Sequence, residues 1–239
     1  MAKTILHTAD SRGLANHGWL NSFHSFSFSS YYNPDKMNFG VLRVLNDDTV
    51  AAGMGFGKHP HDNMEIISIP LEGDLKHEDT MGNATIIKRG DVQVMSAGTG
   101  IAHSEMNANK DKPVKFLQIW VIPNKQNVQP RYDQITLNLE DRHNKLQQIL
   151  SPNPQDAGVW VHQDAWFNLG KLDKDIALNY TFNKTGNGVY AFVLEGAFEI
   201  DGQQLSKRDA LGIWDTSVIS IMSLSADSEI LLMEVPMTM

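Results

Sequence analysis

Cysteine is absent from this 239-residue chain. Disulfide bonds, thiolate metal ligands and a cysteine nucleophile are therefore all excluded. No stretch approaches the roughly 18 consecutive apolar residues that a membrane-spanning helix requires. The N-terminal stretch MAKTILHTADSRG also lacks the apolar run of a secretory signal. We therefore expect a cytoplasmic protein that has no membrane partner.

Basic residues are fewer than acidic residues in this sequence. Lys and Arg number 20 against 28 Asp and Glu, which gives a formal net charge of −8. Nucleic-acid binding depends on clustered basic side chains that neutralise phosphates. We therefore expect no direct contact with nucleic acid, whereas a small aromatic ligand is compatible with this charge.

Long stretches with helical periodicity are also scarce, and the best helix candidate is the short polar segment 139–150. Short β-type runs separated by Gly, Asn and Asp fill much of the remainder. This pattern favours an all-β sandwich or barrel over βαβ units. The runs lie at 39–46, 63–73, 84–95, 115–123, 190–202, 219–225 and 229–235.

A weak internal repeat indicates that the β-fold is duplicated. The tripeptide LEG at 71–73 recurs at 194–196, an offset of 194 − 71 = 123. The tripeptide RGD at 89–91 is echoed by KRD at 207–209, an offset of 207 − 89 = 118. The repeat favours two β-barrels in tandem, and the alternative is a single larger sandwich.

A polar segment with two prolines at 123–134 has the composition of a linker. We place the domain boundary near it. The expected domains are residues 1–130 and residues 131–239.

Two histidines, His59 and His61, lie two residues apart in the stretch KHPHDNME. Alternate residues of a strand point to the same face, so both imidazoles and Glu65 share one side if this stretch is a strand. Pro60 cannot donate a ladder hydrogen bond and favours a sheet edge or barrel rim. Because imidazole is a common ligand of transition metals, the pair is a candidate for half of an open metal site.

The second half of the candidate site is in the stretch GTGIAHSE, where His103 and Glu105 are again two residues apart. Two such pairs facing each other across a barrel would supply three nitrogens and one carboxylate oxygen. Two positions of an octahedral ion would stay open for reactants. The alternative is two unrelated motifs, because paired histidines also occur on surfaces, but their joint occurrence favours a metal site.

The two motifs resemble those of cupins, in which His-x-His-x3-Glu is followed by a second histidine motif. The departures from the general cupin pattern, HSE above all, resemble the pirin family. This resemblance implies an all-β fold of two tandem cupin barrels (double-stranded β-helix or jelly-roll) with few short helices. It is carried by RGLANHGWLNSFHSFSF (12–28), GFGKHPHDNMEII (55–67), MSAGTGIAHSE (95–105) and QIWVIP (118–123), and more loosely by VHQD (161–164) and GIWD (212–215).

The resemblance also implies a ligand set of His59, His61, His103 and Glu105 for one divalent transition metal. Fe(II) is the expected ion, with Ni, Co, Mn, Cu or Zn as alternatives. The motif-one glutamate of cupins corresponds to Glu65, but in pirins the HSE glutamate takes its place. We therefore expect Glu65 to act as a hydrogen-bond partner near the metal.

The C-terminal repeat lacks these ligands. The two offsets place non-ligand residues opposite the motif positions, so we expect no second metal there. These residues are Phe182, Lys184, Gly188, Ile221 and Ser223.

Bacterial pirin-like proteins resemble quercetin 2,3-dioxygenases, so the resemblance implies an oxidoreductase that cleaves flavonols such as quercetin with O2. Glu105 would be the catalytic residue that accepts the flavonol proton. The alternative is a non-enzymatic metal-binding regulator that acts on transcription or metabolism through a protein partner. A third alternative, another cupin reaction on a small acid, would require basic residues near the metal.

Several other residues are expected to be structural. We expect the segment His77-Glu78-Asp79 to form a polar β-turn and His24 to be a core histidine. The larger side chains near the motifs are expected to pack in the core rather than wall a pocket, and these are Met54, Phe56, Met95 and Trp120.

Overall fold

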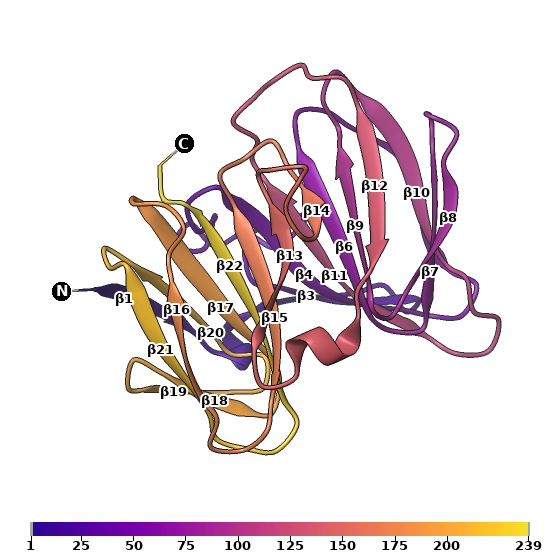
Figure 1. Cartoon of the computed structure of the whole chain (residues 1–239). Coiled ribbons are helices and arrows are strands. Elements are labelled where there is room, and N and C mark those ends of the chain that lie inside the picture. The colour runs from indigo at the N-terminus through magenta and orange to yellow at the C-terminus, as the bar shows by residue number, and fades with distance from the viewer. Residues whose placement is uncertain (1, 239) are drawn as a thin grey trace.

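Strands dominate the fold in the computed structural model, which describes residues 2–238 (Figure 1). Two short 3-10 helices are present among these residues, η1 (Ala9–Ser11) and η2 (Leu139–Arg142). The strands are β1 (Lys3–His7), β2 (Gly13–Asn16), β3 (Leu20–His24), β4 (Leu42–Val50), β5 (Gly55–His61), β6 (Glu65–Glu72), β7 (Asp74–Asp79), β8 (Ala84–Lys88), β9 (Asp91–Ser96), β10 (Ile101–Asn107), β11 (Val114–Val121), β12 (Arg131–Thr136), β13 (Leu146–Ser151), β14 (Val159–Trp160), β15 (Trp166–Leu172), β16 (Ala177–Thr181), β17 (Asn187–Glu195), β18 (Ala197–Ile200), β19 (Gln203–Ser206), β20 (Ala210–Trp214), β21 (Val218–Ser223) and β22 (Ser228–Pro236).

The strands form two barrels of the same construction, each with a seven-stranded and a four-stranded sheet. The N-terminal barrel has the orders β12-β9-β6-β11-β4-β3-β2 and β5-β10-β7-β8. The C-terminal barrel has the orders β1-β20-β17-β22-β15-β13-β14 and β16-β21-β18-β19. The predicted all-β fold of two tandem barrels is therefore confirmed.

The repeated LEG tripeptide marks the same turn in both barrels. Gly73 lies between β6 and β7 with φ 75°, and Gly196 lies between β17 and β18 with φ 74°. Left-handed backbone of this kind favours glycine because a Cβ atom would clash locally. The repeat in the sequence thus reflects a turn that both copies require.

Each barrel is completed by an edge strand from the other half of the chain. Strand β1, before the N-terminal barrel, pairs with β20 of the C-terminal barrel. Strand β12, before the C-terminal barrel, pairs with β9 of the N-terminal barrel. Part of the expected linker 123–134 is therefore strand, and the division into 1–130 and 131–239 stays our proposal for the two repeats.

The helix expected over 139–150 is wrong. The segment begins with the single turn η2, breaks at Asn144 with φ 57°, and continues as strand β13. Pairing with β15 and burial of Ile149 and Leu150 override the weak helical pattern of the segment. No helix within residues 2–238 is long and apolar enough to cross a bilayer.

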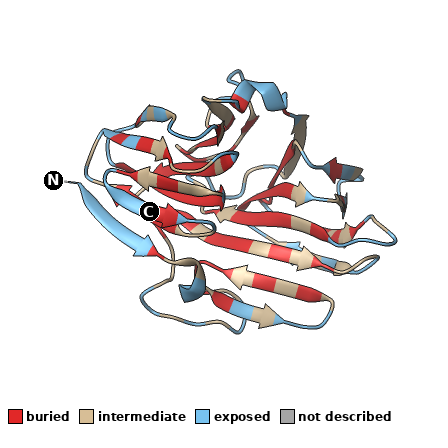
Figure 2. Cartoon of the chain, turned by 90° about the horizontal axis from the view of Figure 1, so that it is seen from below, coloured by how far each residue is buried: buried red, intermediate tan, exposed pale blue. Residues whose placement is uncertain are grey.

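The largest core lies between the barrels, where the outer faces of the two seven-stranded sheets pack together. Side chains such as Leu45 and Leu117 from one sheet meet Phe167, Phe192 and Leu231 from the other. Figure 2 shows how buried residues follow the central strands. Burying each side chain of this size contributes about 1.5–3 kcal/mol, so the C-terminal barrel supports the back of the sheet that carries the site.

The two barrel interiors differ. Apolar side chains fill the C-terminal barrel in one continuous cluster that includes Val193, Ile200 and Ile221. The N-terminal barrel has two small separate clusters, one around Phe116 and one around Ile66. A cavity lies between these two clusters and is lined by residues of both.

Candidate metal centre

Three histidines come together at the mouth of the N-terminal barrel. Ligand nitrogens of His59, His61 and His103 all lie within 4.8 Å of one another. His103 on β10 stands directly opposite His59 on β5. Pro60 is exposed on β5, the edge strand of its sheet, as the missing N–H predicts. The spacing of His59 and His61 predicted their shared face, and the pairing of β5 with β10 brings His103 to them. Their role as metal ligands stays a prediction.

His61 and His103 are held in the neutral form, which is the state that metal binding requires. Burial, and then the neighbouring histidines, lowers the pKa of His61 to about 4 and that of His103 to about 2. His59 Nδ1 lies 2.8 Å from the Gly57 carbonyl oxygen, which fixes its N–H and leaves Nε2 free. Buried His103 Nε2 has no hydrogen-bond partner. The donor set therefore fits one divalent metal ion.

A second buried histidine supports His103 from behind. His77 Nδ1 lies 3.5 Å from His103 Nδ1, and His77 Nε2 lies 3.2 Å from Asp79 Oδ2. The prediction of a turn at His77-Glu78-Asp79 is wrong, because this segment is the end of strand β7, which pairs with β10. The Asp79–His77–His103 chain holds the His103 ring so that Nε2 faces the other two histidines.

We expect His77→Phe to weaken metal binding without abolishing it. A lost supporting partner of a ligand histidine typically costs about 10–100-fold in metal affinity. Phe keeps the ring contact with Tyr132, which lies 4.8 Å from His77 between centroids. Competition with a chelator measures the affinity, with Glu78→Gln on the same strand as the matched control. Equal affinity in His77→Phe and the unaltered chain would show that His77 does not support the ligand.

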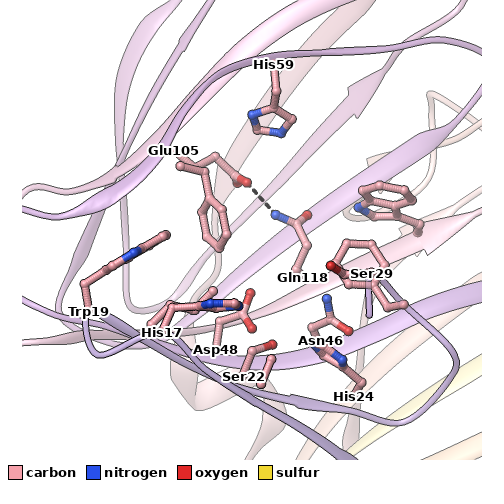
Figure 3. Close-up of a pocket in the computed structure, with 15 residues that line it drawn as sticks. His17, Trp19, Ser22, His24, Ser29, Asn46, Asp48, His59, Glu105 and Gln118 are labelled. Atoms are coloured by element: carbon pink, nitrogen blue, oxygen red, sulfur yellow. Dashed lines mark hydrogen bonds between the residues drawn. The ribbon is translucent and has the colours of Figure 1, made fainter. Parts of the chain in front are cut away.

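Glu105 is buried beside the histidines with both oxygens engaged. Ser68 Oγ donates to Oε1 at 2.8 Å, and Gln118 Nε2 donates to Oε2 (Figure 3). Burial raises the pKa of Glu105. In residues 2–238 the group of mutually close ligand atoms comprises the three histidines without Glu105. Its place among the metal ligands therefore stays a prediction.

Glu65 lies on β6, where Ser96 Oγ donates a 2.7 Å hydrogen bond to Oε2. Burial raises its pKa to about 7, and the Ser96 hydrogen bond and the charge of Arg131 act in the opposite direction. Glu65 also lies outside the group of close ligand atoms in the described chain. Its position is compatible with the expected role as a hydrogen-bond partner.

A cavity of about 310 Å³ opens onto His59 and Glu105. Trp19 packs edge-to-face on Phe56, and Phe28 packs edge-to-face on Trp120, so the walls are aromatic. Phe56 and Trp120 thus face the cavity rather than only the core, and His24 also lines it. Sequence reasoning expected all three to be plain core residues.

Sequence reasoning also missed four polar residues that line this cavity: Ser22, Asn46, Asp48 and Gln118. All four are buried although polar side chains are mostly exposed. Little in the sequence signalled them, since Asn46 and Asp48 stand in the continuously polar stretch Asn46–Thr49, which shows no alternation.

The C-terminal barrel has different residues at the corresponding positions. With β10 aligned to β21 by the offset of 118, His103 corresponds to Ile221, which pairs with Leu178 as His103 pairs with His59. Tyr180 then corresponds to His61. Strand register therefore replaces Phe182 and Lys184 as the counterparts of the first motif, because the offset of 123 does not hold in β16. One metal ion per chain stays our prediction.

A duplicated barrel with three clustered histidines in its first copy defines a metal-binding bicupin. Residues 7–121 match the Pirin family model, and residues 148–235 match the model of the quercetinase C-terminal cupin domain. The chain is 43% identical over 231 residues to quercetin 2,3-dioxygenase of Escherichia coli strain K12, covering 97% of this chain and 98% of that protein. The chain belongs to the pirin family.

Other relatives agree with this assignment. A pirin-like protein of Caulobacter vibrioides is 38% identical over 226 residues, covering 94% of this chain and 96% of that protein. The crystal structure of the bacterial pirin YhhW from Escherichia coli in complex with nickel(II) matches with a TM-score of 0.92 and 42% identity. That match covers 98% of this chain and 99% of the crystallised one.

Proposed function

We propose that the chain is a metal-dependent dioxygenase that cleaves flavonols such as quercetin with O2. His59, His61, His103 and Glu105 would hold the ion. The observation that carries the proposal is the aromatic-walled cavity that opens onto His59 and Glu105. The name of the Escherichia coli relative supports the reaction, and the nickel(II) complex of YhhW supports a divalent ion. Fe(II) is our proposed working ion.

The residues of the chain have distinct parts in this reaction. A bound divalent ion supplies Lewis acidity, which lowers the pKa of a coordinated hydroxyl group. Glu105 accepts the proton of the flavonol 3-hydroxyl. Ser68 and Gln118 hold the carboxylate in place. The aromatic walls orient a flat substrate and exclude water.

The charge of the cavity favours a neutral substrate. Its lining among the described residues contains no Lys or Arg, whereas Asp48 and Glu105 both face it. Apart from the metal ion, a small anionic acid would find no cationic side chain to pair with and two acidic groups nearby. The cavity therefore supports a neutral phenolic substrate over the small acid of other cupin reactions.

The test is turnover of quercetin by protein that has been stripped of metal and reloaded with Fe, Mn, Co, Ni, Cu or Zn in turn. We expect O2 consumption and loss of flavonol absorbance with at least one redox-active ion. Glu105→Ala should slow turnover by about 10²–10⁴-fold, the range for loss of a general base. Absence of turnover with every ion, although one ion binds tightly, would overturn the proposal and favour the regulator that acts through a protein partner.

A further inference from the structure

The inner face of the N-terminal sheet carries a row of polar side chains. Strand register places them side by side across β3, β4, β11, β6 and β9. Each is at most 7% exposed. Burial of polar groups is unfavourable unless they are hydrogen-bonded, so the row requires an explanation. Its members are His24, Asn46, Gln118, Ser68 and Gln93.

The C-terminal barrel shows that the fold does not need this row. Its sheet runs through the corresponding strands β15, β22, β17 and β20, whose residues pair in the same order. Asn168 takes the place of Asn46 there, but the next three positions are apolar. They are Leu232, Ala191 and Leu211, in place of Gln118, Ser68 and Gln93. The polar row therefore belongs to the cavity and not to the barrel.

Two amide oxygens of the row lie without partners beside the cavity. Gln118 donates through Nε2 to Glu105, which leaves its Oε1 unpaired. A carboxylate only accepts hydrogen bonds, so this contact fixes which way the Gln118 amide points. Asn46 stands directly opposite Gln118, and its Oδ1 is also buried and unpaired. The pair presents two neighbouring acceptors that call for donors from a ligand.

Asp48 lies at the next inward-facing position of β4 after Asn46 and adds a third unpaired oxygen. Its Oδ1 is buried without a partner, and Ser22 stands opposite it on β3. Burial raises the pKa of Asp48 to about 7, the hydrogen bond from Ser22 acts in the opposite direction, and the charges of Glu105 and Asp47 act in the same direction as burial. In its neutral form Asp48 can both donate and accept a hydrogen bond.

These polar residues lie together at one side of the cavity. We call Ser22, His24, Asn46 and Asp48 the polar strip. Figure 3 shows the strip at the side away from His59, with Glu105 and Gln118 between them. Trp120 Nε1 and His24 Nδ1, both lining residues, are buried and unpaired as well. A ligand that reaches from the histidines across the cavity would contact the strip.

We propose that the polar strip is a second recognition site, which binds the hydroxyl groups of an aromatic ring remote from the metal and so selects neutral polyhydroxylated aromatic compounds. This inference rests on the proposed function. Phenolic hydroxyls donate to the amide oxygens of Asn46 and Gln118, whereas a ring without hydroxyls leaves those oxygens buried and unpaired. A site built to hydrogen-bond a hydroxyl discriminates strongly against an analogue that lacks it.

The test compares the binding of quercetin and 3-hydroxyflavone to zinc-loaded protein. The two compounds share the 3-hydroxyl and the adjacent ketone, but 3-hydroxyflavone lacks the other hydroxyls. We expect quercetin to bind at least ~10-fold more tightly to the unaltered chain. Asn46→Leu should reduce this preference to within ~3-fold, because Leu offers no acceptor. Asn168→Leu, the same change at the corresponding position of the other barrel, should keep the preference.

The zinc content and unfolding temperature of each variant show that the fold and the metal site are intact. Equal affinity for both compounds in the unaltered chain would overturn the proposal, and so would a preference unchanged by Asn46→Leu. If Asn46→Leu does not fold, the smaller change Ser22→Ala and the comparison on the unaltered chain still decide. A preference without O2 consumption would sustain the strip and refute the dioxygenase. Turnover without a preference would refute the strip alone.

Discussion

His103→Ala is expected to remove the bound metal, taking the chain from one tightly held ion to none. His103 is the most buried of the three clustered histidines, and its Nε2 is a buried nitrogen without another partner. It also links the other two imidazoles, with ring centroids 4.5 Å from His59 and 4.9 Å from His61. Two half-buried imidazoles alone make a weak site, because catalytic metal centres typically need three protein ligands.

Metal analysis after dialysis against a weak chelator measures this result. His61→Ala should behave in the same way, and Glu105→Ala tests whether the carboxylate is a fourth ligand. His143→Ala is the matched control, since His143 is half exposed and bonds to Asp173 far from the cluster. One tight ion per chain in His103→Ala would refute the histidine assignment, and two ions in the unaltered chain would refute the single site.

Glu65→Gln is expected to raise the free energy of unfolding of the metal-stripped protein at pH 8. The effect of the substitution at pH 8 should exceed its effect near pH 4.5 by about 3 kcal/mol. Burial raises the pKa of Glu65 from 4.5 to about 7 in the folded state. The folded state therefore retains a proton that the unfolded state has lost, and stability falls as pH rises from about 4.5 to 7. Each unit of difference in pKa corresponds to about 1.4 kcal/mol.

Urea unfolding of Glu65→Gln and of the unaltered chain at pH 4.5 and pH 8 gives the difference in their free energies of unfolding at each pH. The contributions of the other titrating groups cancel in that difference. Gln keeps an oxygen that can accept from Ser96 Oγ, so the hydrogen bond is preserved. Glu72→Gln is the control on the same strand, where the carboxylate is exposed. A stability difference that does not vary with pH would show that Glu65 is ionised in the fold.

The sequence was sufficient for the barrels and the three histidines because local rules and the resemblance to pirins together indicated them. Alternation along a strand decides which side chains share a face, so the i, i+2 spacing put His59 beside His61 and His103 beside Glu105. The position of Pro60 on an edge strand also followed from its missing N–H. The pairing of β5 with β10, which brings His103 to the other two histidines, was implied by the resemblance and not by a local rule.

The failures came where pairing between distant strands decides the outcome. The segment 139–150 becomes β13 because β15 is available to pair with it. His77 meets His103 only because β7 lies beside β10. The polar strip depends on β3 and β4 being neighbours at one register. No local pattern contains that information, and the continuously polar stretch Asn46–Thr49 does not reveal which of its side chains face inward.

The pairing of β1 and β12 across the repeats has a consequence for the chain as a whole. A fragment that ended at residue 130 would lack β12, one of the two strands that pair with β9, and its β1 would have no sheet to join. The other fragment would keep β12 while leaving the edge at β20 open. The two repeats are therefore interlocked rather than merely tethered, and the copy without the histidine cluster persists as an indispensable half of one cooperative unit.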